Sequence, residues 1–409
     1  MPSEPEVAYV WLWLPGATEP VPAGWIERDG AVYSFAYGST YLSRPDAVSI
    51  YGPELPLSPG PQYPRSGELA GSLRDGGPDR WGRRVIEHRL GASMGDEFDA
   101  LTYLLESESD RIGALDFQAS PTEYVPRSAR PASLEDLVTA AERLERREPL
   151  PPALEQALFH GSAIGGARPK ALLGDGARRL IAKFSSSSDP YPVVKGEYVA
   201  MELARRVGLD VAPVRLVSVL GRDVLLVERF DRTPAGARRA MVSGLTILGL
   251  DEVTDARYGS YVELATRIRT DFTLPDATLR ELFGRVTFNI LVSNNDDHAR
   301  NHAAFWDGHR LTLTPAFDVT PQPRSGETST QQMAIGDDGY RESNVFGCVE
   351  RAAIYHLSEL EAREIVEHQI EVIRAEWQDV CDVAGLGEED RERFWGLQFL
   401  NPGSIREGG

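Results

Sequence analysis

The sequence is poor in cysteine, poor in positive relative to negative charge, and has no long apolar run. Its 409 residues include two cysteines, Cys348 and Cys381, too few for a disulfide framework or a cysteine zinc site. Lysine and arginine number 43 against 62 aspartates and glutamates, and this net charge of −19 disfavours direct binding to nucleic acid. No stretch is apolar enough to cross a bilayer, and the acidic start lacks the basic residues of a signal peptide. We therefore expect a cytoplasmic protein that does not bind membranes.

The length allows more than one hydrophobic core, and the composition is that of a folded protein, with 42% hydrophobic and 26% charged residues. Aromatic and β-branched residues punctuated by proline and glycine predict strands near the N-terminus. The proline-rich segment 148–152 is the best linker. We predict an N-terminal accessory domain over residues 1–150, a nucleotide-binding lobe over 151–235 and a helical lobe over 236–409.

The most informative stretch is residues 293–301, with the sequence SNNDDHARN. Apolar residues at helical spacing between Leu279 and Ile290 predict a buried helix that leads into it. Asp296 and Asn301 have the D-x-x-x-x-N spacing of a protein-kinase catalytic loop, in which the aspartate accepts a proton and the asparagine holds magnesium. Asp318, after a short strand-like run, supplies the further oxygen ligand that this chemistry needs. The alternative is a polar loop that merely caps helices.

A glycine-rich stretch, residues 161–170, precedes a predicted hairpin. Its adjacent Gly165 and Gly166 let backbone N–H groups approach phosphate oxygens, although the stretch is neither a Walker A loop nor G-x-G-x-x-G. Lys183 lies in the second strand, where a kinase lysine grips phosphates, and Glu197 at the start of the next helix is its expected partner. The alternatives are a snorkelling edge lysine and an acid that favours the helix dipole.

Together these segments resemble the HipA family of bacterial serine/threonine kinases, over nearly the whole chain. The matching segments are 162–170 (glycine-rich loop), Lys183, 227–232 (hinge), 295–301 (catalytic motif), 314–318 (metal-binding motif) and 78–84 with the N-terminal strands. The resemblance implies an α+β, two-lobed kinase-like fold of HipA type. It also implies a mainly β N-terminal accessory domain and a helical C-lobe.

The resemblance also implies roles for individual residues. Asp296 would be the general base, and Asn301 and Asp318 would hold Mg²⁺. The residues expected to bind or support ATP are Ile164, Gly165, Gly166, Ala167, Lys170, Lys183, Glu197, Glu228, Phe230, His298 and Asn301. The best-known family members autophosphorylate a serine at the position where this chain has Ala163. Ser162, one residue earlier, is therefore the candidate autophosphorylation site.

The expected function is that of an ATP- and Mg²⁺-dependent serine/threonine protein kinase, the toxin of a toxin–antitoxin module that arrests growth through a translation-related protein. By resemblance its partners would be a HipB-like helix-turn-helix antitoxin and a protein substrate such as an aminoacyl-tRNA synthetase, although nothing in the sequence selects one. Two alternatives stay open. They are a small-molecule kinase and a catalytically silent kinase fold that bridges an antitoxin on DNA.

Overall fold

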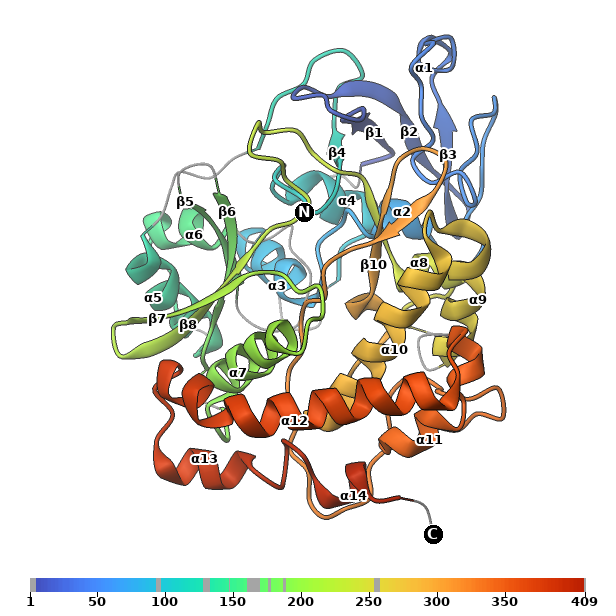
Figure 1. Ribbon diagram of the computed structural model, residues 1–409. Coiled ribbons are helices and arrows are strands. Elements are labelled where there is room, and N and C mark those ends of the chain that lie inside the picture. Colours follow the sequence, from blue (N-terminus) through green and yellow to red (C-terminus); the bar gives the residue numbers. More distant parts are fainter. Residues whose placement is uncertain are drawn as a thin grey trace. The chain divides into compact units, whose positions relative to one another are not determined.

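The computed structural model describes residues 5–92, 97–127, 133–146, 148–159, 170–175, 178–186, 189–253 and 258–407 of the chain (Figure 1). The chain forms two compact units and passes between them several times. Unit 1 contains residues 1–187, 217–242 and 305–309, and unit 2 contains residues 188–216, 243–304 and 310–409. In the described part of the chain no helix is both long and apolar enough to span a membrane. The division into three parts at residues 150 and 235 stays a prediction.

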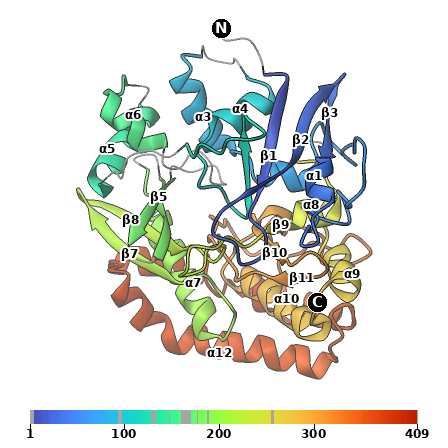
Figure 2. The same cartoon turned by 90° about the horizontal axis from the view of Figure 1, so that it is seen from above.

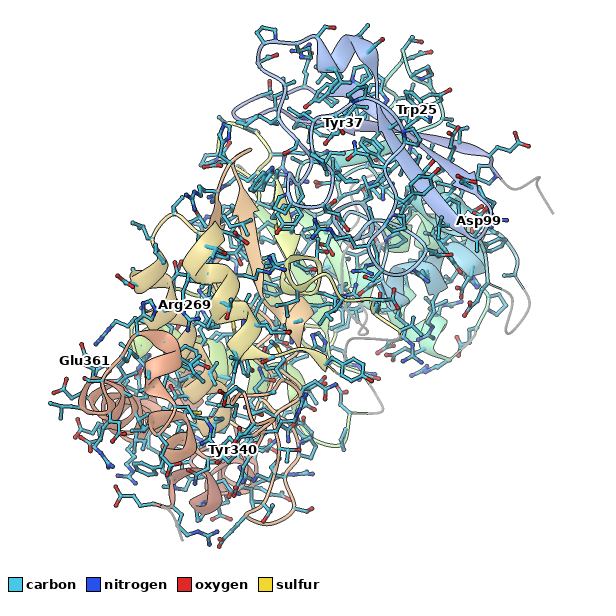
Figure 3. All side chains as sticks on the ribbon, turned by 90° about the vertical axis from the view of Figure 1, so that its right-hand side faces the viewer. Trp25, Tyr37, Asp99, Arg269, Tyr340 and Glu361 are labelled. Carbon is cyan, nitrogen blue, oxygen red and sulfur yellow. The ribbon has the colours of Figure 1, made fainter. Side chains whose placement is uncertain are left out.

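The first sheet of unit 1 is antiparallel and has the strand order β3-β2-β1-β4. Its strands are β1 (Val7–Leu12), β2 (Val21–Asp29), β3 (Val32–Tyr37) and β4 (Leu115–Gln118). Gly30, with a φ of 64°, lies in the tight turn between β2 and β3, and this left-handed conformation favours glycine. Tyr37, labelled in Figure 3, points into the core and donates a hydrogen bond to the carbonyl of Leu55.

Among the described residues, four helices lie between β3 and β4 in the sequence. They are α1 (Ser39–Leu42), α2 (Gly71–Arg74), α3 (Arg80–Arg89) and α4 (Ala100–Glu106). The strands predicted for the N-terminal region are therefore present, but helices interrupt them. Asp79 and Asp99 cap α3 and α4, since each side chain accepts backbone N–H bonds from the first turn.

The second sheet of unit 1 has the order β5-β6-β8-β7. Its strands are β5 (Lys170–Asp175), β6 (Arg178–Phe184), β8 (Arg222–Glu228) and β7 (Val214–Val219), whose first residues belong to unit 2. Alternate residues of β6, Leu180, Ala182 and Phe184, pack into a core with α3, α5 (Leu134–Glu145) and α6 (Pro152–Phe159). Since side chains alternate along a strand, Lys183 lies on the other face.

Unit 2 is mainly helical. Its longest helix, α12 (Glu359–Val383), packs against α7 (Val193–Arg206) and α10 (Pro275–Leu291), as Figures 1 and 2 show. Ser358 and Glu361 form a capping box at its start. The other elements are α8 (Gly244–Leu248), α9 (Tyr261–Asp271), η2 (Ala299–Asn301), β11 (Leu311–Leu313), α11 (Val345–Val349), η3 (Ala352–Tyr355), α13 (Glu388–Phe394) and α14 (Pro402–Ile405). The chain crosses between the units in β9 (Met241–Ser243) and β10 (Ala303–Trp306).

One predicted helix boundary is wrong. The sequence places Glu197 in the first turn of its helix, whereas α7 begins four residues earlier, at Val193. The prediction starts the helix after Gly196, because glycine usually interrupts helices. Here it lies inside the helix, where a Cβ atom would stand 3.2 Å from the ring of Phe394. The position is therefore glycine because an aromatic ring packs against it.

Candidate active site

The loop after α10 is built around a buried carboxylate. Three side chains converge on Oδ2 of Asp297: Asn289 Nδ2 donates to it at 2.8 Å, Tyr261 OH also donates, and His302 Nε2 lies 2.9 Å away. Burial opposes ionisation of Asp297, but the nearby His302 and these hydrogen bonds outweigh it and lower its pKa. Asp297 is therefore a charged anchor for the loop, which sequence reasoning did not single out.

The neighbouring Asp296 has the opposite environment, because its side chain is exposed. Although the side chain reaches solvent, neighbouring groups remove part of the water around its carboxyl group, and this raises its pKa. His298 opposes the rise, whereas the negative charges of Asp318 and Asp297 add to it. Asp318, also in unit 2, is thus close enough for its charge to act on Asp296. A carboxylate with a raised pKa is a better proton acceptor, which suits the role predicted for Asp296.

Hydrogen bonds fix the backbone of the strand-like segment that leads to Asp318. Thr314 donates its N–H and its hydroxyl to the carbonyl of Ala303, at 3.0 and 3.1 Å. Ala316 donates to the carbonyl of Asp210, and the buried Arg285 of α10 donates to the carbonyl of Thr314 at 2.9 Å. Asp318 itself has a φ of 61°, a left-handed conformation that aspartate adopts more readily than most residues. Such strained positions are common where a side chain must be aimed.

Asn301 ends the short helix η2, and its N–H bonds to the carbonyl of His298 at 2.8 Å. Asn301 and Phe317, the neighbour of Asp318, border one small cavity of about 10 Å³, room for about one water. The amide oxygen of Asn301 and the carboxylate of Asp318 are the hard oxygen ligands that Mg²⁺ prefers. The described residues contain no cluster of three His, Cys, Asp or Glu side chains. The assignment of Asn301 and Asp318 as Mg²⁺ ligands stays a prediction, and phosphate oxygens and water would complete such a site.

Gly244 sits directly against this loop. Its N–H donates to the carbonyl of His302 at 2.6 Å, and a Cβ atom there would lie 2.5 Å from the carbonyl oxygen of Ala299. We expect Gly244→Ala to push η2, with Asn301, out of place and to lower stability by about 1–3 kcal/mol. Thermal unfolding checks this against Gly387→Ala, since a Cβ at Gly387 meets nothing within 4 Å. Equal unfolding midpoints for the two variants would show that the loop tolerates the methyl group.

The predicted nucleotide residues fall in several places. Lys170 and Lys183 face each other across β5 and β6 of unit 1, and Lys170 is buried. Glu228 ends β8, while Phe230 packs edge-on against Phe305.

The other predicted nucleotide residues are not all placed. The structure does not describe Ser162, Ile164, Gly165, Gly166 and Ala167. Glu197 is buried in α7 of unit 2, and its pairing with Lys183 stays a prediction. Asp296 and Asp318 thus belong to unit 2, and the two lysines face each other in unit 1.

The predicted hinge has a structural role that sequence reasoning missed. Arg229 and Asp231 are buried, and Arg229 Nη2 donates to Asp231 at 2.9 Å and to the carbonyl of Arg111 at 2.7 Å. Asp231 also accepts the N–H of Gly113. Burial opposes ionisation of Asp231, yet the guanidinium groups of Arg229 and Arg232 lower its pKa to about 2. These residues tie the end of β8 to the segment before β4.

Comparison with known families decides the classification. Residues 162–377 match the HipA-like C-terminal domain, and residues 16–118 match the HipA N-terminal domain. The first match alone covers more than half of the chain. The chain belongs to the HipA family. The family predicted from the sequence is therefore confirmed.

Individual HipA relatives are distant. The chain is 24% identical over 299 residues to the serine/threonine-protein kinase toxin HipA of Shewanella oneidensis, covering 66% of each protein. It is 23% identical over 325 residues to the putative kinase Y4dM of Sinorhizobium fredii, covering 72% of this chain and 73% of that one. The chain thus spans about two thirds of the length of the curated relatives that it matches.

A solved structure confirms the fold. It is the complex of HipA, HipB and operator DNA from Shewanella oneidensis MR-1, matched with a TM-score of 0.68 at 19% identity. The match covers 91% of this chain and 92% of that one. The predicted α+β fold of HipA type is therefore correct.

Proposed function

We propose that this HipA-family chain is a kinase that transfers the γ-phosphoryl group of ATP to a serine or threonine of a protein. One observation carries the proposal. Asp296 is an exposed aspartate whose pKa is raised in part by the negative charge of Asp318. It lies on a loop that the buried Asp297 anchors. The names of the relatives, a serine/threonine-protein kinase toxin and putative kinases, support the same class of reaction.

Each residue then has one task. The substrate hydroxyl attacks the γ-phosphorus, the bond from that phosphorus to the bridging oxygen breaks, and ADP leaves. Asp296 accepts the hydroxyl proton as this happens. Asn301 and Asp318 would hold Mg²⁺, which would supply positive charge to balance the negative charge on the phosphate oxygens. Lys183 offers its ammonium group to the phosphates, and the buried Asp297 keeps the loop in position.

The test is transfer of label from γ-³²P-ATP into the proteins of a bacterial lysate, followed by phosphoamino-acid analysis. We expect labelled phosphoserine or phosphothreonine with the wild type and Mg²⁺, and none after chelation. Label found only in small molecules would favour a small-molecule kinase instead. A lack of any transfer would favour the catalytically silent fold.

Loss of either proposed magnesium ligand should weaken nucleotide binding. We expect Asn301→Ala and Asp318→Ala each to lower ATP affinity about tenfold in the presence of Mg²⁺, because a hard oxygen ligand is removed. Calorimetric titrations with and without Mg²⁺ measure this. Asn295→Ala is the matched control, since Asn295 lies in the same loop but bonds to Ser329 instead. Unchanged affinity in both ligand variants would remove these residues from the metal site.

We also propose that the chain is the toxin of a toxin–antitoxin module and binds a helix-turn-helix antitoxin. The solved HipA structure that it resembles is a complex with HipB and operator DNA, which supports this proposal. Overproduction of the wild type should arrest growth, and co-expression of the antitoxin should relieve the arrest. Normal growth at high levels of active enzyme would contradict the toxin role.

A further inference from the structure

The start of α3 is held more firmly than a helix cap requires. Oδ1 of Asp79 accepts the N–H groups of Trp81 and Gly82, at 3.1 and 3.2 Å, which caps the helix. The indole of Trp81 is fully buried in the core beneath the second sheet of unit 1. The sequence resemblance assigns residues 78–84 only to the N-terminal accessory domain.

Both residues reach one distant strand residue. Trp81 Nε1 donates to the carbonyl of Lys170 at 3.2 Å, across 89 residues of sequence. Lys170 Nζ lies 3.9 Å from Oδ2 of Asp79, and both side chains are about 95% buried, with exposed fractions of 5% and 4%. Lys170 is the first residue of β5 and the last residue of the glycine-rich stretch. The contacts therefore fix the point where the chain enters the strand.

Lys170 is also the cross-strand partner of Lys183. Directly opposite residues of an antiparallel pair point to the same face, so two like charges are placed side by side. A buried ammonium group is costly unless an opposite charge accompanies it. The carboxylate of Asp79 supplies the opposite charge for the ammonium group of Lys170. Lys183 therefore lies beside a lysine whose charge is balanced.

We propose that Asp79 and Trp81 are positioning residues for nucleotide binding. They hold Lys170 by its ammonium group and its carbonyl, and through the β5–β6 pair they hold Lys183 in place. The inference rests on the proposed function, because it takes Lys183 as the phosphate-binding lysine. It gives the N-terminal part of the chain an effect on ATP affinity that acts through Lys170 and Lys183.

Two variants isolate the two contacts. Asp79→Asn removes the charge but keeps a cap, since asparagine caps helices as well as aspartate does. Trp81→Phe removes the indole N–H and keeps an aromatic ring. Electrostatics alone would make ATP bind more tightly once an acid leaves the vicinity of its phosphates. A positioning role makes the opposite prediction, a loss of affinity.

We expect each variant to bind ATP·Mg about tenfold more weakly than the wild type, with a raised KM for ATP and a kcat that changes less. In a Lys170→Met background Asp79→Asn should cause no further loss, because the pair no longer exists. Asp99→Asn is the matched control, being the same substitution at the cap of α4 (Figure 3). It should leave ATP affinity unchanged.

Amide hydrogen exchange of the nucleotide-free protein separates this inference from the proposed function. Both variants should speed exchange in β5 and β6 while α4 stays protected. Failure of the wild type to bind ATP·Mg would overturn the proposed function, and unchanged exchange in β5 would overturn the anchor itself. Unchanged or tighter ATP binding by Asp79→Asn would overturn the positioning role, as would a loss that persists in the Lys170→Met background.

Discussion

Replacing Asp296 with asparagine will abolish most of the phosphoryl transfer while leaving the fold intact. The substitution keeps the size of the side chain and removes the proton acceptor, which is worth about a hundredfold to ten-thousandfold in kcat. Because the side chain is exposed, we expect a change in stability within about 0.5 kcal/mol. Single-turnover kinetics with saturating ATP and thermal unfolding of the same preparation provide both values.

Asp337→Asn is the matched control for this experiment, because Asp337 is another exposed aspartate of unit 2. It should transfer phosphate at the wild-type rate. If Asp296→Asn does so as well, Asp296 is not the base, and the role of the loop must be reassigned.

Replacing the adjacent Asp297 with alanine should have a large effect on stability instead. Asn289, Tyr261 and His302 would lose their shared acceptor in a buried site. Removing one partner from a buried charged network typically costs about 3–5 kcal/mol. Urea denaturation should therefore show a lower midpoint, and activity should fall because the loop loses its anchor.

Asp296→Ala gives the contrast, since it makes the same truncation one residue away at an exposed position. Its midpoint should match that of the wild type. Equal midpoints for Asp296→Ala and Asp297→Ala would contradict the assignment of Asp297 as the structural carboxylate of the pair.

The parts of this molecule that local patterns specify could be predicted from sequence. Apolar residues at helical spacing identified α10, and the polar run after it identified the loop. The spacing of Asp296, Asn301 and Asp318 indicated kinase chemistry, and the set of motifs led to the HipA family, which the family matches confirm. The hairpin predicted after the glycine-rich stretch is present as β5 and β6.

Long-range contacts account for what the sequence did not reveal. Asp296 and Asp297 are chemically identical neighbours, and the contacts of Asp297 with Tyr261, Asn289 and His302 distinguish them. Arg229 and Asp231 looked like part of a hinge because their partners, at residues 110–113, lie far away in sequence. In the same way, nothing near Lys170 in the sequence indicates that Asp79 pairs with it.

We propose above all that Asp296 and Asn301 of the loop, together with Asp318, hold magnesium-bound ATP for phosphoryl transfer. A crystal structure of the protein with Mg²⁺ and a non-hydrolysable ATP analogue tests this most directly. We predict a Mg²⁺ ion about 2.1 Å from oxygens of Asn301 and Asp318 and from the phosphates, with the Asp296 carboxylate facing the γ-phosphate. A nucleotide bound elsewhere, with these three side chains free of metal and phosphate, would contradict the account.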